Sequence, residues 1–160
     1  EFEFHTPVDN NWLIQAMASY TYGINPKSDH YIIENGQIIG TEEIKNDPLC
    51  EIPPFEGTIK FSWKFFNARL IPMLSLRAVA PQHNISAAYN ERSSAGFCLA
   101  GISVFYKLNE MFEVSAGADN LFDVAYYEHL NRNMVGTQTD FYEPGRNFYF
   151  SLKFKIQSSK

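Results

Sequence analysis

Residues 147–156 (NFYFSLKFKI) alternate between two kinds of side chain without interruption. Phe148, Phe150, Leu152, Phe154 and Ile156 fall on one side, and the residues between them, mostly polar, fall on the other. A period of two is the geometry of a β-strand, because successive side chains of a strand point to opposite faces. The segment therefore predicts a strand with one apolar face and one wet face. The question it raises is whether the apolar face meets a protein core or lipid.

The same period recurs along the chain and predicts further strands. In the segment 55–65, for example, Phe61 and Trp63 oppose Lys60 and Ser62. Seven strands are expected, over residues 1–6, 12–23, 55–65, 69–80, 97–108, 111–119 and 147–156. Pro72 interrupts the fourth of them, and we expect a bulge there because proline cannot donate to a ladder. The pattern predicts an all-β, antiparallel up-and-down meander.

The connections between these strands alternate in length. Short connections follow the first, third and fifth strands. Long polar segments follow the second and fourth strands, over residues 24–54 and 81–96. Outer-membrane β-barrels have short turns on the periplasmic side and longer loops outside. Aromatic residues near the strand ends fit the interfacial girdles of such barrels. The alternative is that they are core aromatics of a soluble β-sandwich.

Composition excludes several classes of protein. The net charge is −5 and the chain has no cluster of Lys and Arg, so a nucleic-acid partner is not expected. No apolar run approaches the roughly 18 residues of a membrane-spanning helix. A membrane β-barrel is compatible with the composition, because alternation hides the apolar face of each strand from hydropathy averages.

No catalytic motif is present, so the chain is not expected to be an enzyme or to carry a cofactor. Cys50 and Cys98 belong to no CxxC or Cys/His cluster. We interpret them as two unrelated small side chains rather than as a disulfide or a metal pair, and no metal site is expected.

Two short motifs near the C-terminus carry a family resemblance. One is Asn120, Leu121, Phe122 and Asp123 after the sixth predicted strand, and the other is Pro144, Gly145 and Arg146 before the last strand. Upstream, residues 52–57 (IPPFEG) precede another predicted strand. With the strand pattern, these features resemble the C-terminal β-barrel region of a TonB-dependent outer-membrane receptor. Within the NLFD motif, Asn120 and Asp123 suit a turn, and Leu121 and Phe122 are expected to anchor it.

The resemblance implies a location in the bacterial outer membrane and active uptake of a scarce ligand, an iron-siderophore complex or another metal chelate. Such receptors close a barrel of about 22 strands, which seven strands cannot do. Because the chain also begins at Glu1 without Met or signal peptide, we expect residues 1–160 to be a single C-terminal segment, without the plug domain and earlier strands. The implied partners are that plug, the missing strands, outer-membrane lipid, the imported ligand and, indirectly, TonB.

The long segment after the sixth strand holds the candidate ligand-binding residues. Glu128, His129, Asn131 and Arg132 place a carboxylate, an imidazole, an amide and a guanidinium on one loop, which could grip a metal chelate or an anionic ligand. The alternative is a structural loop whose polar groups are satisfied by neighbouring loops. For the whole chain, the rival function is a soluble small-ligand-binding β-barrel or sandwich. An isolated piece of membrane barrel is expected to self-associate, since it exposes two sheet edges and an apolar face.

Overall fold

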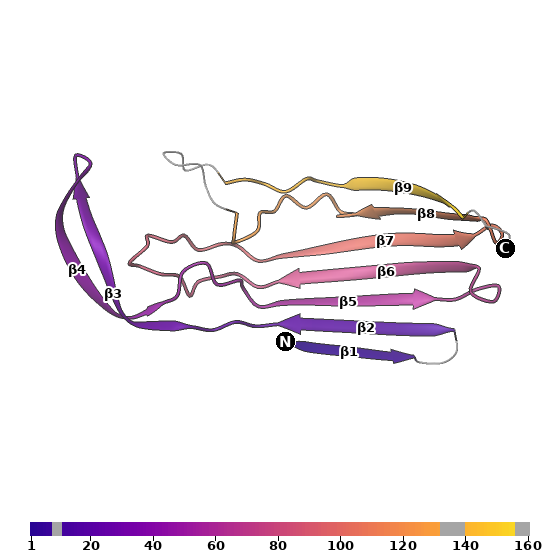
Figure 1. Ribbon diagram of the computed structural model, residues 1–160, viewed down its shortest axis with the longest axis horizontal. Coiled ribbons are helices and arrows are strands. Elements are labelled where there is room, and N and C mark those ends of the chain that lie inside the picture. The colour runs from indigo at the N-terminus through magenta and orange to yellow at the C-terminus, as the bar shows by residue number, and fades with distance from the viewer. Residues whose placement is uncertain (8–10, 132–139, 156–160) are drawn as a thin grey trace, which may run out of the picture.

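The computed structural model describes residues 1–7, 11–131 and 140–155. Within these residues, nine β-strands form a seven-stranded sheet and a separate two-stranded hairpin (Figure 1). The strands are β1 (Phe2–Pro7), β2 (Trp12–Ser19), β3 (Ile24–Glu34), β4 (Gln37–Pro48), β5 (Glu56–Trp63), β6 (Leu70–Val79), β7 (Phe97–Lys107), β8 (Phe112–Asp119) and β9 (Asn147–Phe154). No helix in this part of the chain is long and apolar enough to cross a membrane.

The large sheet is an antiparallel up-and-down meander in the order β1-β2-β5-β6-β7-β8-β9. Its seven strands fall on the seven predicted segments, so the all-β architecture is confirmed. The boundaries differ by a few residues. The largest difference is in β2, which ends at Ser19 rather than Gly23, so that Tyr20 and Tyr22 lie beyond the strand.

The register places like side chains in rows across the sheet. One row joins six strands through the Cα pairs of Ile14, Phe61, Leu74, Ile102, Ala118 and Phe148. The adjacent row, offset by one residue in each strand, joins His5, Gln15, Lys60, Ser75 and Gly101. Because a shift of one residue turns every side chain to the other side, the sheet has one apolar face and one polar face.

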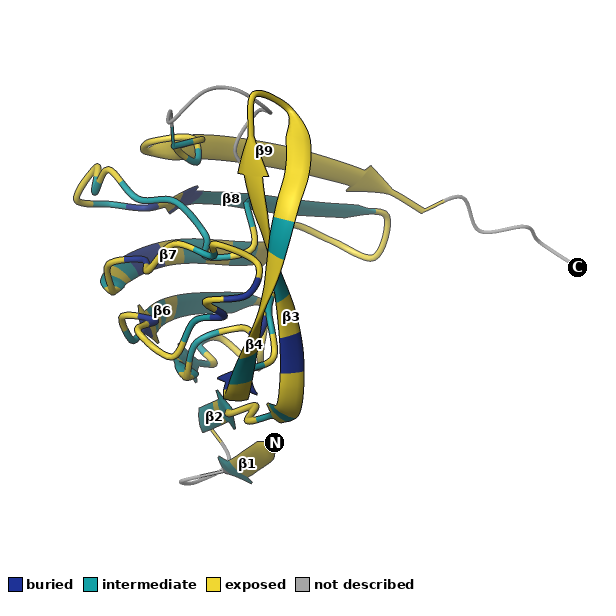
Figure 2. Ribbon diagram, turned by 90° about the vertical axis from the view of Figure 1, so that its left-hand side faces the viewer, coloured by how far each residue is buried: buried dark blue, intermediate teal, exposed yellow. Residues whose placement is uncertain are grey.

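The apolar face is open. Leu74 and Ile102 are 45% and 49% exposed, and Phe148 and Phe150 are 72% and 71% exposed. Figure 2 shows β9 exposed along its length. Among the described residues, the buried apolar side chains are few and mostly small: Ile52, Val79, Ala88, Ala100 and Ala118. The described apolar face therefore does not form the core that a soluble sandwich requires.

The two ends of the sheet differ in the length of their connections (Figure 1). The pairs β1–β2, β5–β6 and β7–β8 are joined at one end, where β9 also terminates; we call it the turn end. The long connections β2–β5, β6–β7 and β8–β9 lie at the other end, which we call the loop end. The predicted sorting of short and long connections is confirmed.

The first long connection is more ordered than expected. Residues 24–54 were predicted to be a polar connection, but most of them form the hairpin of β3 and β4, which projects beyond the loop end (Figure 1). At its tip Asn35 and Gly36 have φ values of 51° and 78°, as a tight hairpin turn requires. The sequence signal was present, since Asn-Gly flanked by isoleucines favours a hairpin. Pro26 and Pro48 weakened this signal, because proline is disfavoured inside strands and both residues fall near the ends of β3 and β4.

The predicted bulge at Pro72 is wrong. The ladder between β6 and β7 runs without a shift through Ile71↔Phe105, Pro72↔Val104 and Met73↔Ser103. The ladder to β5 ends at Ser62↔Met73. The same register resumes at the Phe65↔Leu70 bridge. Pro72 therefore interrupts the hydrogen bonding to β5, because it has no N–H to donate, but it does not shift the register.

Aromatic side chains gather at both ends of the sheet. At the turn end, the rings of Trp12 and Trp63 stack with centroids 3.9 Å apart, and Phe65 lies 4.3 Å from Trp63. At the loop end, Tyr20 and Phe55 have centroids 6.5 Å apart. Aromatic residues near both ends of the strands are typical of a β-sheet that spans a bilayer.

Candidate functional site

The polar face of the sheet is hollowed near the loop end. A cavity of about 490 Å³ is lined by strand residues, including Lys60, Arg77 and Asp119, and by Tyr126 and Pro144 from the β8–β9 connection. Gly101, which also lines this cavity, has no side chain to fill it, and an added Cβ would lie 2.7 Å from the Ser75 hydroxyl oxygen. This hollow therefore lies on the polar face of the sheet.

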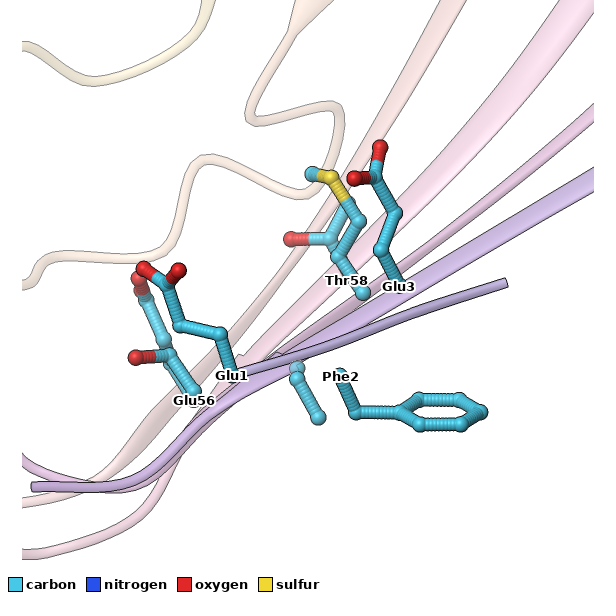
Figure 3. A pocket seen from close by; sticks show the side chains of 9 residues that line it. Glu1, Phe2, Glu3, Glu56 and Thr58 are labelled. Carbon is cyan, nitrogen blue, oxygen red and sulfur yellow. The ribbon is translucent and has the colours of Figure 1, made fainter. Parts of the chain in front are cut away.

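Figure 3 shows that charged and apolar side chains of the first strand lie on opposite sides of the sheet. The side chains of Glu1, Glu3, Glu56 and Thr58 lie on the same side, around a hollow of about 290 Å³, whereas Phe2 points to the opposite side. The carboxylates thus belong to the polar face and the ring belongs to the apolar face.

Arg77 of β6 is the charged centre of the polar face. Its guanidinium donates to Glu56 Oε2 at 2.6 and 3.1 Å and to the Glu128 carboxylate at 2.5 and 3.2 Å. The guanidinium carbon also lies 5.4 Å from the centroid of the Phe97 ring, which in turn contacts Tyr126 at 4.5 Å. Burial, followed by the nearby carboxylates Glu143 and Glu128, raises the pKa of Tyr126. Through its ion pair with Glu128, Arg77 connects the β8–β9 connection to strand β6 of the sheet.

The candidate residues on that connection have separate partners. Glu128 pairs with Arg77. His129 is almost fully buried; its Nε2 donates to Glu91 Oε1 at 3.2 Å, and its Nδ1 lies 3.0 Å from Ser94 Oγ. Asn131 Nδ2 donates to Glu143 Oε1 at 2.8 Å and to the Phe141 carbonyl at 3.2 Å.

Arg132 lies outside the described residues. The three described candidates are neighbours in sequence, but their side chains reach three different groups. Each is engaged within the chain, and their role in ligand binding stays a prediction.

Glu91 joins three loop-end segments. Its two carboxylate oxygens accept the backbone N–H groups of Glu51 and Ser86, both at 2.7 Å, in addition to His129. The carboxylate of Glu91 therefore holds together the long connections that precede β5, β7 and β9. Sequence reasoning missed Glu91, because two of its three partners, His129 and Glu51, are 38 and 40 positions away and no local pattern indicates them.

Asp47 docks the hairpin onto the loop end. Its carboxylate accepts the Ser86 hydroxyl at 2.5 Å and the Ala87 N–H at 2.9 Å, and both Asp47 and Ser86 are fully buried. His30 Nδ1 lies 3.0 Å from the Ala88 carbonyl oxygen. Burial by itself would raise the pKa of Asp47, but the hydrogen bonds from Ser86, Ala87 and Ala88 outweigh it, and the net pKa is below the ordinary value of 3.8.

The two terminal motifs are in direct contact. Asn120 exchanges two 2.9 Å hydrogen bonds with the backbone of Val124, and Asp123 Oδ1 accepts the N–H of Arg146 at 2.8 Å. A Cβ on Gly145 would lie 2.5 Å from that same oxygen. A side chain at position 145 would therefore push the Asp123 carboxylate away from the Arg146 N–H, which gives a physical reason for the pairing of the motifs.

Within the first motif, Asn120 is buried and Asn120 and Asp123 both adopt positive φ, at 50° and 56°. Phe122, which was expected to anchor the turn, is 76% exposed instead.

A second cavity, of about 360 Å³, lies among the loop-end segments. It is lined by Cys50, Tyr89, Arg92, Tyr127, His129, Asn131, Asp140 and their neighbours. Aromatic rings and hydrogen-bonding groups around one opening suit a ligand with flat and polar parts. Among the described residues, no group of three or more His, Cys, Asp or Glu is placed to hold a bare metal ion.

Comparison with known proteins identifies the fold. No protein-family model and no curated protein matches the sequence. Over 94% of its length, however, the chain superposes on the copper transporter OprC with a TM-score of 0.72 and 24% identity. It also matches FpvA of P. aeruginosa, solved with heterologous pyoverdines, and the ferric enterobactin receptor PfeA of Pseudomonas aeruginosa. Both have 16% identity over 95% of the chain, with TM-scores of 0.57 and 0.59.

The chain has the fold of a TonB-dependent receptor barrel. It spans about a fifth of that fold: 22% of OprC, 18% of FpvA and 21% of PfeA. In this receptor fold the seven-stranded sheet is one part of a larger closed wall, consistent with the C-terminal barrel region.

Proposed function

We propose that residues 1–160 are the C-terminal barrel segment of a TonB-dependent receptor in the bacterial outer membrane, which takes up a metal chelate. The segment supplies wall strands and loops on the ligand side, and the rest of the receptor supplies the plug domain, the other strands and the contact with TonB. The observation that carries the proposal is the open apolar face, bounded by aromatic residues at both ends, on a sheet whose connections are sorted by length.

A metal complex is the proposed ligand class. The similar structures include a copper transporter, an FpvA complex with ferric pyoverdine and a ferric enterobactin receptor. In the described loop-end segments (residues 20–55, 80–96, 120–131 and 140–146), eleven Asp and Glu face four Lys and Arg, a net charge of −7. A field of that sign favours the approach of a neutral or cationic complex over a strongly anionic one.

The loop cavity is the proposed contact surface. Asn131 and Tyr89 line its opening, and Tyr89 is largely exposed. Glu128 and His129 would then act mainly by holding the β8–β9 connection in place. Arg132, which follows Asn131 in the sequence, stays a candidate ligand-binding residue.

Uptake by cells tests the proposal. The full-length receptor is expressed in cells that lack their own metal receptors, with and without functional TonB, and accumulation of radioactive copper and of ferric siderophores is followed. We expect accumulation of at least one metal complex that depends on both the receptor and TonB. Accumulation that is unchanged without TonB, or no accumulation of any metal complex by a correctly folded receptor, would contradict it.

A further inference from the structure

Three side chains at the loop end form a chain of hydrogen bonds. Ser94 Oγ lies 3.0 Å from His129 Nδ1, and His129 Nε2 lies 3.2 Å from Glu91 Oε1. An ionised carboxylate can only accept, so the proton of the neutral ring is on Nε2, and Nδ1 is the acceptor that faces the Ser94 hydroxyl. A hydroxyl, an imidazole and a carboxylate connected in this order are the parts of a nucleophilic triad.

The surroundings of the imidazole hold it in this orientation. The Glu91 carboxylate is fixed by the backbone N–H groups of Glu51 and Ser86, both at 2.7 Å. The His129 side chain is only 3% exposed, so water competes little for its ring nitrogens. The two ring nitrogens have exchanged places relative to the serine-protease triad, but one still faces the hydroxyl and the other the carboxylate. His129 is therefore oriented as a general base for Ser94.

The three residues border the second cavity, of about 360 Å³, at the loop end. Glu91, Ser94 and His129 all line it, together with Tyr89 and Tyr127. Ser94 is otherwise buried, with 5% exposure. A small molecule in this cavity would contact Ser94 beside its base, and the two tyrosine rings suit a flat, aromatic group.

A cation at the same cavity suits the charge that acyl transfer creates. Arg92 lines the cavity, and its guanidinium pairs with Asp140 at 3.4 Å. Attack of a hydroxyl on an ester carbonyl places negative charge on the carbonyl oxygen, which a nearby cation stabilises. A nucleophile, its base, an orienting carboxylate and a cation thus surround one cavity.

We propose that Ser94, His129 and Glu91 form an esterase site that hydrolyses a small aromatic carboxylic ester. Ser94 Oγ forms a bond to the ester carbonyl carbon while its proton passes to His129 Nδ1. The tetrahedral intermediate releases the alcohol, which takes that proton from His129. Water then attacks the acyl group on Ser94 with the same help from His129, which yields the carboxylic acid and restores the hydroxyl.

This activity goes beyond the proposed function, which requires only binding and passage. It depends on contacts among the described loop-end residues and requires neither TonB nor transport. No local motif marks the site, because His129 is 35 positions from Ser94 and reaches it only where the β6–β7 and β8–β9 connections meet.

Covalent labelling of the full-length receptor tests the assignment. A fluorophosphonate probe reacts with an activated serine hydroxyl, forms a bond between Oγ and phosphorus, and releases fluoride. The purified receptor is treated with this probe in detergent, and the labelled residue is located by mass spectrometry. We expect labelling at Ser94 and none at Ser93. Ser93 is the internal control, because it lines the same cavity and is exposed, so accessibility alone would favour it over Ser94.

Ester hydrolysis supplies the second arm. Release of p-nitrophenol from p-nitrophenyl benzoate should fall by roughly 100-fold in Ser94→Ala, and Ser93→Ala should leave it unchanged. Glu91 positions His129 and does not touch the substrate. Glu91→Gln should therefore lower the rate of labelling at saturating probe by about tenfold or more, with an unchanged half-saturating concentration. A merely structural Glu91 would instead weaken the binding of the probe.

The outcomes that would overturn the inference are distinct from those that would overturn the proposed function. No labelling at Ser94 in a heat-modifiable, folded receptor, equal labelling at both serines, or hydrolysis that survives Ser94→Ala would overturn the esterase site alone. A receptor that is labelled at Ser94 but imports no metal complex loses only the proposed function. If Ser94→Ala does not fold, the position of the label in the unaltered receptor still decides the question.

Discussion

At the scale of single residues, the contact between Gly145 and Asp123 explains why two separated motifs belong together. An added methyl at Gly145 would meet Asp123 Oδ1 at 2.5 Å and displace the acceptor of the Arg146 N–H. We expect Gly145→Ala to destabilise the folded receptor by about 1 kcal/mol, the cost of a typical lost hydrogen bond. Gly40→Ala is the control, because its nearest neighbour would be 3.7 Å away. Thermal unfolding in detergent measures both, and equal midpoints would refute the explanation.

The ionisation of Asp47 should make the docking of the β3–β4 hairpin depend on pH. Its lowered pKa means that docking of the hairpin is fully supported above the ordinary carboxyl value of 3.8 and is lost as pH falls through the lower folded value. Peptic cleavage of the hairpin in the full-length receptor should therefore rise steeply below about pH 3.8, after correction with an unfolded substrate.

The matched variants are Asp47→Asn and Asp29→Asn. Asp47→Asn should weaken docking by about 1–3 kcal/mol and make cleavage nearly independent of pH. Asp29→Asn, on the exposed side of β3, should keep the original profile. A flat profile in the unaltered receptor would show that Asp47 does not hold the hairpin.

The contacts around Arg77, Glu91 and Asp47 lay beyond sequence reasoning. Arg77 falls in the predicted strand 69–80, but its partner Glu128 is 51 positions away. The partners of Glu91 and Asp47 are found only when three long connections fold against one another. Residue types in the β8–β9 connection could be read as candidates for ligand binding, whereas the groups that they contact could not.

At the scale of elements, the turn between β5 and β6 is strained. Phe66, Asn67 and Ala68 all have positive φ, between 52° and 61°. A left-handed conformation costs a residue with a side chain about 1–2 kcal/mol, which glycine avoids. We expect Ala68→Gly to stabilise the receptor by somewhat less than 1 kcal/mol, because glycine loses more entropy on folding. Refolding midpoints in urea measure the change, and destabilisation by Ala68→Gly would contradict the assignment.

Most strands of the wall were predictable because one apolar face and one polar face give a strand a period of two, and in the proposed receptor lipid would bury the apolar face. β7 is the exception, since it carries apolar residues such as Leu99 and Ile102 on both faces. The hairpin of β3 and β4 was not predicted, because neither of its faces is buried in that way. Ile32 and Ile33 are exposed on one strand, and Ile38 and Ile39 are exposed on the other. A hairpin that buries neither face does not need to alternate apolar and polar residues, so the Asn35-Gly36 turn was the remaining sequence signal for it.

At the scale of the whole molecule, an open seven-stranded sheet cannot remain alone in water. Both β1 and β9 present a free edge, and the apolar face is uncovered. We expect the isolated 160-residue chain to associate in detergent-free buffer. Light scattering should report oligomers or aggregates that are reduced by detergent, and a monodisperse monomer without detergent would contradict this.

In the proposed receptor, the apolar face of the sheet meets lipid and the polar face lines the barrel. Adjacent residues of β6 test it most directly, in a full-length receptor whose own cysteines are replaced. A nitroxide is attached at Leu74→Cys or at Ser75→Cys in a reconstituted bilayer, and its collisions with oxygen and with a water-soluble nickel complex are compared. We expect the nitroxide at position 74 to collide more with oxygen and the nitroxide at position 75 to collide more with the nickel complex. Equal accessibility at both positions, or the reverse order, would contradict it.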